Sequence, residues 1–132
     1  KAEGRDSNGG RGKMTNVSIR SDRGYAKIVI KGHAGYGMLN NLPEGHDIVC
    51  AAISMLGQTL VQRLMDMADE QKVILHNLRC GPGEINVRVL AKRGNRDELE
   101  ITIKTVEAGM KLIQEQYPDY IKVGVLDSAE DI

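Results

Sequence analysis

The stretch "IVCAAISMLGQTLVQRLMDMA", residues 48–68, decides the fold of this chain of 132 residues. It contains no proline and one glycine, and for three turns apolar residues occupy almost every side before polar ones appear. This pattern predicts a helix that is buried most deeply at its N-terminal end. Asp47, directly before the stretch, is a preferred N-cap residue, so the helix is predicted to begin after it.

Paired strands are predicted on both sides of this helix. Before it, residues 16–20 and 25–32 are alternating or β-branched runs joined by "SDRG"; after it, residues 72–78 and 84–91 are joined through "RCGPG". Residues 34–46, between the first pair and the helix, are rich in turn formers. A loop of this length in a compact domain tends to be functional or mobile.

A second helix and a last strand complete the predicted elements. Asp97 and Glu100 resemble a capping box, and the following "LEITI" can be read as the start of a helix or as a strand. Pro118 ends the helix, residues 121–126 form a strand, and "DSAEDI" is a frayed acidic tail. One helical face is predicted from apolar residues at spacings of four and three: Leu99, Ile103, Val106, Met110, Ile113 and Tyr117.

The resulting order, ββαββαβ, predicts an α+β fold: a two-layer sandwich with two helices packed on one face of a five-stranded mixed sheet. Residues 14–132 are expected to form a single domain, since 41% hydrophobic content suffices for one core. Residues 1–13, "KAEGRDSNGGRGK", have no apolar residue except Ala2. We interpret them as a disordered leader or a cloning remnant.

Composition argues against several classes of partner. Lys and Arg number 18, as do Asp and Glu, so no long-range field favours a polyanion or a charged membrane surface. With no Trp, no Phe and four Tyr, base-stacking platforms are scarce, and we expect no direct nucleic-acid binding. We find no window approaching the roughly 18 apolar residues of a membrane span and no signal sequence. The expected location is the cytoplasm, without a membrane partner.

Cys50 lies near the start of the predicted helix. A buried cysteine is usually a small hydrophobe, but the first turn of a helix favours an anion and can lower the pKa of a thiol to roughly 3.5–7.5. The charge of Asp47 opposes this effect unless its carboxylate turns towards the helix amides or a histidine. Cys50 and Cys80 do not need to form a disulfide in a reducing cytosol, and the spacing of Cys and His predicts no zinc site and no cofactor.

Three histidines compete to be the base for this thiol. His33 directly follows a predicted strand, and such a strand end commonly lies near the N-terminus of the next helix. His46 is closer in sequence but follows Gly45 on the loop, where a fixed orientation is harder to keep. His76 alternates with apolar residues and is interpreted as a partly buried packing residue. His33 is therefore the best geometric candidate.

A narrow face of mostly small residues runs along the first helix, at Cys50, Ser54, Gly57 and Val61. It allows another backbone to come close. Either a strand or helix packs there, or a substrate chain or the base uses part of the space, with Ser54 supplying a hydroxyl. The residues alone leave both readings open, as they leave Cys50 either a core residue or a nucleophile.

"GHAG" at 32–35 followed by "GHDIVCAAIS" at 45–54 resembles the signature of the ribosomal-processing cysteine protease family, also called Prp. "EQYPDYIKV" at 115–123 resembles the C-terminal end of that family. The resemblance implies a small cytoplasmic endopeptidase that acts as a homodimer. Its substrate would be the N-terminal extension of large-subunit ribosomal protein twenty-seven, or a similar leader on a phage protein.

Carried onto this chain, the resemblance implies Cys50 as nucleophile and His33 as general base, with Gly32, Asp47 and Ser54 as supporting motif positions. Asp47 either orients His33 or caps the helix. The chain departs from the family pattern in its long segment 34–49 between the two catalytic residues. The added apolar residues Met38, Leu39 and Leu42 suggest part of a lid over an apolar substrate.

Two further hypotheses follow from the same residues. The chain could be a non-catalytic ribosome-assembly or leader-binding module, which the intact Cys and His argue against. It could also be a thiol redox sensor, which the lack of a nearby resolving cysteine argues against.

Overall fold

A computed structural model describes residues 14–32, 44–81 and 83–127, with residues 44–47, 126 and 127 described by their backbone alone. The predicted order of elements is confirmed, and the disordered-leader interpretation of residues 1–13 lies outside the described part. The elements are β2 (Thr15–Asp22), β3 (Tyr25–Lys31), α3 (Glu44–Asp69), β4 (Val73–Gly81), β5 (Glu84–Ala91), α4 (Arg96–Gln116) and β6 (Ile121–Asp127).

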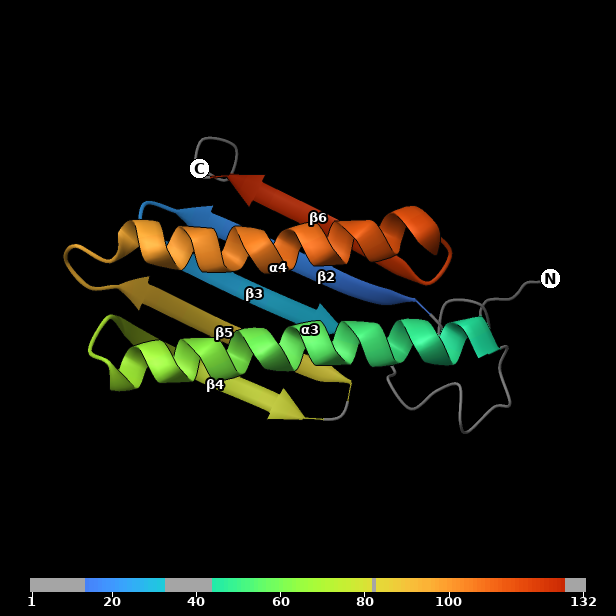
Figure 1. The fold of residues 1–132 in the computed structure, drawn as a ribbon, viewed down its shortest axis with the longest axis horizontal. Helices are drawn as coiled ribbons and strands as arrows, with labels where there is room; N and C mark the ends of the chain where they lie inside the picture. Colours follow the sequence, from blue (N-terminus) through green and yellow to red (C-terminus); the bar gives the residue numbers. More distant parts are fainter. Residues whose placement is uncertain (1–13, 33–43, 82, 128–132) are drawn as a thin grey trace.

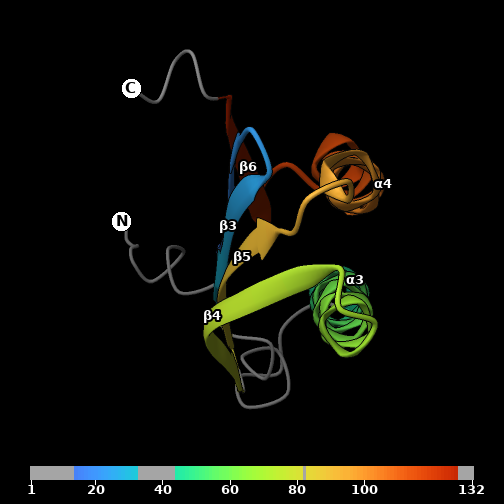
Figure 2. The same cartoon turned by 90° about the vertical axis from the view of Figure 1, so that its left-hand side faces the viewer.

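The five strands form one mixed sheet in the order β4-β5-β3-β2-β6 (Figure 1). Three neighbouring pairs are antiparallel, and β6 runs parallel to β2. Both helices α3 and α4 cover the same face of this sheet, and no helix of the described residues lies on the other face (Figure 2). The predicted two-layer α+β sandwich is therefore confirmed.

The core lies between the sheet and the helices. Every second residue of the central strands is buried, for example Ala26, Ile28 and Ile30 in β3, as the period of two requires. The stripe predicted on α4 also faces the core: Leu99, Ile103, Val106 and Met110 are buried, and Ile113 and Tyr117 pack against them. "LEITI" is thus helical.

Helix α3 differs from the prediction in its burial. It is not buried most deeply at its N-terminal end, because Leu60, Leu64 and Met67 are fully buried in its second half. Ile48 and Met55, near its beginning, are exposed, since a helix on the outside of a two-layer fold always has one face in solvent. Contrary to our reading of the sequence, Ile48–Asp69 is long and apolar enough to cross a membrane, but a core helix has the same property.

Two helix starts also differ from those predicted. Helix α4 begins at Arg96 with Asn95 at the N-cap position, so Asp97 lies inside its first turn and is not the cap. Helix α3 begins at Glu44, so Asp47 is the fourth residue of the helix and cannot be its N-cap. The second of these corrections changes the surroundings of Cys50.

An ion-pair network joins the end of α3 to the start of α4. Glu98 accepts hydrogen bonds from Arg63 at 2.8 Å and from Lys72 at 3.0 Å, and Glu70 lies 3.5 Å and 3.3 Å from the same two cations. The hydrogen bond from Lys72 lowers the pKa of Glu98, and the hydrogen bonds to Glu98 and Glu70 raise the pKa of Lys72. The network holds the two helices together at the end of α3 that is farther from Cys50.

Candidate active site

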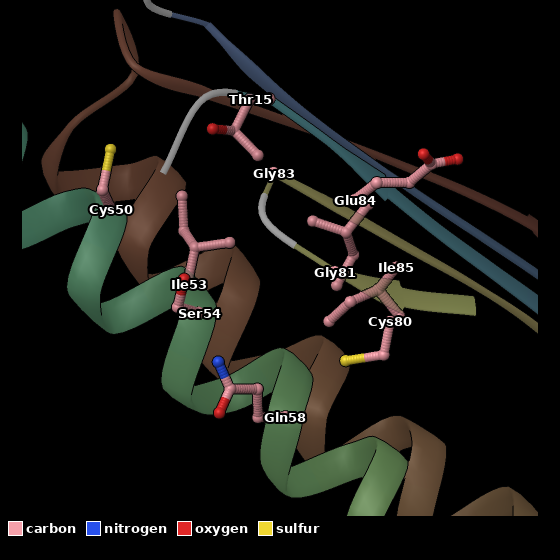
Figure 3. Close-up of a pocket in the computed structure, with 12 residues that line it drawn as sticks. Thr15, Cys50, Ile53, Ser54, Gln58, Cys80, Gly81, Gly83, Glu84 and Ile85 are labelled. Carbon is pink, nitrogen blue, oxygen red and sulfur yellow. The ribbon is translucent and has the colours of Figure 1, made fainter. Parts of the chain in front are cut away.

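A pocket opens between α3 and the ends of four strands, β2, β3, β4 and β5 (Figure 3). The carboxyl end of β3 lies beside the N-terminal half of α3 (Figure 1). The tip of the β4–β5 hairpin forms another wall. The lining residues are Thr15, Ile30, Gly32, Cys50, Ile53, Ser54, Gln58, Cys80, Gly81, Gly83, Glu84 and Ile85.

Cys50 is a buried thiol at the edge of this pocket. It is 6% exposed and is not part of a disulfide. Because α3 begins at Glu44, Cys50 is the seventh residue of the helix and lies in its second turn, not in the predicted first turn. In a regular α-helix the N–H of residue 50 donates to the carbonyl of residue 46, and the dipole effect falls off beyond the first turn. Activation by the helix N-terminus is therefore weaker than predicted.

Gly32 is held tightly at the end of β3. Its N–H donates to the carbonyl of Gly83 at 2.9 Å. A Cβ atom on Gly32 would overlap the hydroxyl of Thr15 and lie 2.8 Å from the Thr15 Cα, so only glycine fits here without a shift of backbone. The chain thus leaves β3 at a fixed point of the pocket, one residue before His33. His33 itself lies outside the described residues.

The small-residue face of α3 divides into two parts. A Cβ on Gly57 would lie 2.7 Å from Ile85 Cδ1 and 3.1 Å from Ile30 Cδ1, so the helix approaches the sheet closely at this glycine. Val61 is buried in the same packing. Towards the N-terminus, Cys50 and Ser54 border the pocket instead. Packing thus accounts for the second half of the face, and space for a ligand lies beside the first half.

Strand β4 contains a bulge that determines what its last residues face. His76 is paired with Arg88 and Arg79 with Asn86, so two residues of β4, Asn77 and Leu78, stand opposite one residue of β5. Without the bulge, Arg79 would be paired with Ile85 and would face the helices. With it, Cys80 takes that register position and lines the pocket.

Cys80 is the pocket residue that the sequence reading missed most clearly. We expected a loop from residue 79, but β4 continues to Gly81, and Cys80 faces the pocket from the sheet while Cys50 faces it from α3 (Figure 3). The two free cysteines thus line the same pocket from opposite walls. Thr15, Gly83 and Ile85 were also missed, because pocket walls from distant strands carry no local signal, and so was Gln58, which lies two turns after Cys50 on α3.

The remaining predicted residues are placed as follows. His76 is exposed on the sheet face without helices, so its interpretation as a partly buried packing residue is wrong, and it does not approach Cys50. The side chains of His46 and Asp47 lie outside the described residues, although the backbone of both belongs to α3. Among the residues described, no three His, Cys, Asp or Glu side chains form a metal-binding group.

This arrangement suits nucleophilic attack on a peptide that enters the pocket. A thiol and a hydroxyl, from Cys50 and Ser54, lie one helical turn apart beside the apolar side chains of Ile30, Ile53 and Ile85. Such a mixture of one reactive group and a mostly apolar wall is typical of a site that holds an apolar side chain next to a reacting bond.

Solved structures with the same fold include proteases. A protein from Streptococcus mutans is 25% identical, with a TM-score of 0.64, and the match covers 90% of this chain and 99% of that one. The essential ribosomal processing protease Prp from S. aureus, in complex with a substrate peptide, is 22% identical with a TM-score of 0.60, covering 85% and 99%. The same protease with a covalently linked product peptide is 23% identical with a TM-score of 0.57, with the same coverage.

Of the two sequence comparisons, one finds no match and the other matches a protein family. No curated protein matches the chain. The family described as cysteine protease Prp matches residues 14–122, which include both parts of the motif that carries the resemblance. The chain therefore belongs to the Prp cysteine protease family.

Proposed function

We propose that this protein is a cysteine endopeptidase in which Cys50 is the nucleophile and His33 the general base. The observation that carries the proposal is that Cys50 and Gly32 line one pocket, so the residue directly before His33 lies at the thiol's pocket. Gly32 sets where the chain leaves β3, and Ser54 borders the same space. Asp47 lies inside α3 and so cannot cap it. The other role that we considered for Asp47, orienting His33, is therefore the one proposed.

The reaction would run through a covalent intermediate. His33 takes the Cys50 proton, the thiolate attacks the carbonyl carbon of the scissile bond, and the leaving amine departs with a proton from His33. Water then hydrolyses the thioester and releases the thiol. The product peptide covalently linked to the S. aureus protease supports this chemistry. The oxyanion needs N–H donors other than that of Cys50, which lies within the helix.

The proposed substrate is an N-terminal leader of a ribosomal protein. Support comes from the S. aureus relative, which is a ribosomal processing protease with a bound substrate peptide. The apolar wall of Ile30, Ile53 and Ile85 fits an apolar side chain next to the cleaved bond. Large-subunit ribosomal protein twenty-seven is the first candidate, and a phage protein with a similar leader is the second. A cytoplasmic homodimer is the proposed working form.

The decisive experiment compares two cysteine variants on a leader peptide. Cys50→Ala should fold, bind the peptide and leave its mass unchanged after incubation, whereas the matched control Cys80→Ser should still cut it. Cleavage by Cys50→Ala at the wild-type rate would refute the assignment. Wild-type protein that binds the peptide but never changes its mass would instead support the non-catalytic binding module.

A further inference from the structure

The sheet face without helices is strongly cationic, although the whole chain is neutral. In the alternation of the strands, the side chains on this face include six of Lys or Arg and two of Asp or Glu. The helices carry the opposite charge, with nine acidic residues against four basic ones in α3 and α4. The cations of the open face are Arg20, Lys27, Lys31, Arg79, Arg88 and Lys122; the carboxylates are Asp22 and Glu84.

Three of these cations, Arg20, Lys27 and Arg88, form one row across the sheet, with His76 at its end. His76 is paired with Arg88, Arg88 with Lys27, and Lys27 with Arg20, so the row crosses four neighbouring strands. With strands about 4.8 Å apart, the row spans about 14 Å. Like charges directly opposite each other destabilise a sheet, so packing within the sheet gives no reason for such a row.

A hollow on this face brings three of the cations together. Lys27, Arg79 and Arg88 line it with Asn77 and Asn86, and Leu78 completes the wall. Arg79 faces the hollow only because the bulge of β4 shifts its register, and Asn77 in this bulge takes a left-handed backbone conformation (φ 53°). Among the side chains that the structure describes, no carboxylate forms an ion pair with these three cations.

We propose that this open face, centred on Lys27, Arg79 and Arg88, binds a nucleic acid through its phosphate backbone. Regularly spaced cations with amide side chains between them suit a chain of phosphates. A second copy docking the same face would bring two cationic surfaces together, so that occupant is disfavoured. The scarcity of aromatic residues, from which we expected no such binding, excludes base stacking but not contacts with phosphates.

RNA is the occupant that follows if the proposed function holds, because ribosomal proteins are found with ribosomal RNA. Binding at the open face does not use Cys50, since the pocket lies on the helix side of the sheet. The face would hold the protease near its substrate without reading a base sequence. The affinity should therefore depend on salt much more than on sequence.

The test compares two triple variants of the full chain that lose the same charge. Lys27→Gln with Arg79→Gln and Arg88→Gln removes the three cations of the hollow. Arg93→Gln with Lys104→Gln and Lys111→Gln removes three cations outside the open face. The probe is a labelled single-stranded RNA of about 20 nucleotides in random sequence, titrated across salt. We expect the open-face variant to bind at least ten-fold more weakly, and its slope of log K against log salt to be smaller by about 2. Leader cleavage by the same variant should be unchanged.

Two results would overturn the proposal. One is an equal loss of RNA binding in both triple variants, or no loss in either, with thermal unfolding showing that both are folded. The other is equal or tighter binding of a polyglutamate of the same charge, which would identify an acidic protein as the occupant. Neither result bears on cleavage, so failure here is distinguishable from failure of the protease assignment.

Discussion

Gly32 packs so closely on Thr15 that a single methyl group placed on it would lie 2.8 Å from the Thr15 Cα. Thr15 is itself held by its N–H, which donates to the carbonyl of Tyr120 at 2.9 Å, so it cannot withdraw without disturbing the connection into β6. The end of β3 is therefore fixed from two sides, and the chain leaves it in one direction.

Gly32→Ala should impair both stability and cleavage. The added Cβ pushes β3 away from Thr15, an overpacking effect that typically costs about 1–3 kcal/mol in the free energy of unfolding. The shift moves the adjoining His33, so we expect kcat to fall at least ten-fold. Gly124→Ala is the matched control, since a Cβ there has no neighbour within 4 Å. Equal kinetics for the two variants would contradict the positioning role.

The alkylation of Cys50 should depend on His33. The measurement needs a Cys80→Ser background, because Cys80 is exposed and would also react with iodoacetamide. In that background we expect fast alkylation already near neutral pH. Replacing His33 by Ala should move the midpoint of the rate profile towards about pH 8.5, the range of an ordinary thiol, because the nearby imidazolium is lost. The same midpoint with and without His33 would count against the pair.

Adjacent residues of α3 should differ sharply in their effect on stability. Leu64 is fully buried, so Leu64→Ala should lower the free energy of unfolding by about 2–5 kcal/mol through lost burial and a cavity. Its neighbour Met65 is 42% exposed, and Met65→Ala should change it by less than about 1 kcal/mol. Chemical denaturation measures both. Similar losses would mean that α3 does not present this face to the sheet.

The Glu98 network should stabilise the fold only over a defined pH range. The pKa of Glu98 is lowered in the folded state, so its contribution is present above its ordinary value, about 4.3, and is lost as the pH falls through the folded value. The pKa of Lys72 is raised, so its contribution is lost only at strongly alkaline pH. Glu98→Gln should therefore lower Tm at pH 7 and lower it by less at pH 3.

The control for this comparison is Glu100→Gln, which removes a carboxylate of the same helix that forms no ion pair among the described residues. Because the groups of the network are exposed, the difference at pH 7 should be modest and should shrink with added salt. A Glu98→Gln effect that is the same at both pH values would show that packing, not charge, is responsible.

The order and faces of the elements could be predicted because they follow from local periodicity. The α4 stripe from Leu99 to Tyr117 is an example, since every residue of it faces the core. The start of α3 could not be predicted from the sequence. Gly45 and Asp47 locally favour a later start, whereas the helix begins at Glu44. Of the candidate site, Cys50, Gly32 and Ser54 line one pocket, while the catalytic roles of Cys50 and His33 stay predictions.

The pocket residues on other strands could not be predicted from the sequence for a different reason. Cys80 lines the pocket only because of a bulge, and a bulge depends on the pairing of two strands that alternation within one of them does not reveal. A local hint exists in Asn77, since asparagine tolerates a left-handed conformation better than most residues. The cationic open face could not be predicted either, because the net charge of the whole chain sums the basic open face and the acidic helices to zero.

The bulge in β4 affects both the pocket that contains Cys80 and the hollow that contains Arg79, which lie on opposite faces of the sheet. Losing one residue from it would carry Arg79 to the helix side and Cys80 to the open side in a single step, because every residue beyond it changes face together. A codon deleted at Asn77 or Leu78 would thus alter the pocket and the cationic hollow at once, while substitutions could change either alone. In evolution, an insertion or deletion in the bulge would therefore change both surfaces together, whereas substitutions can change one surface and leave the other as it is.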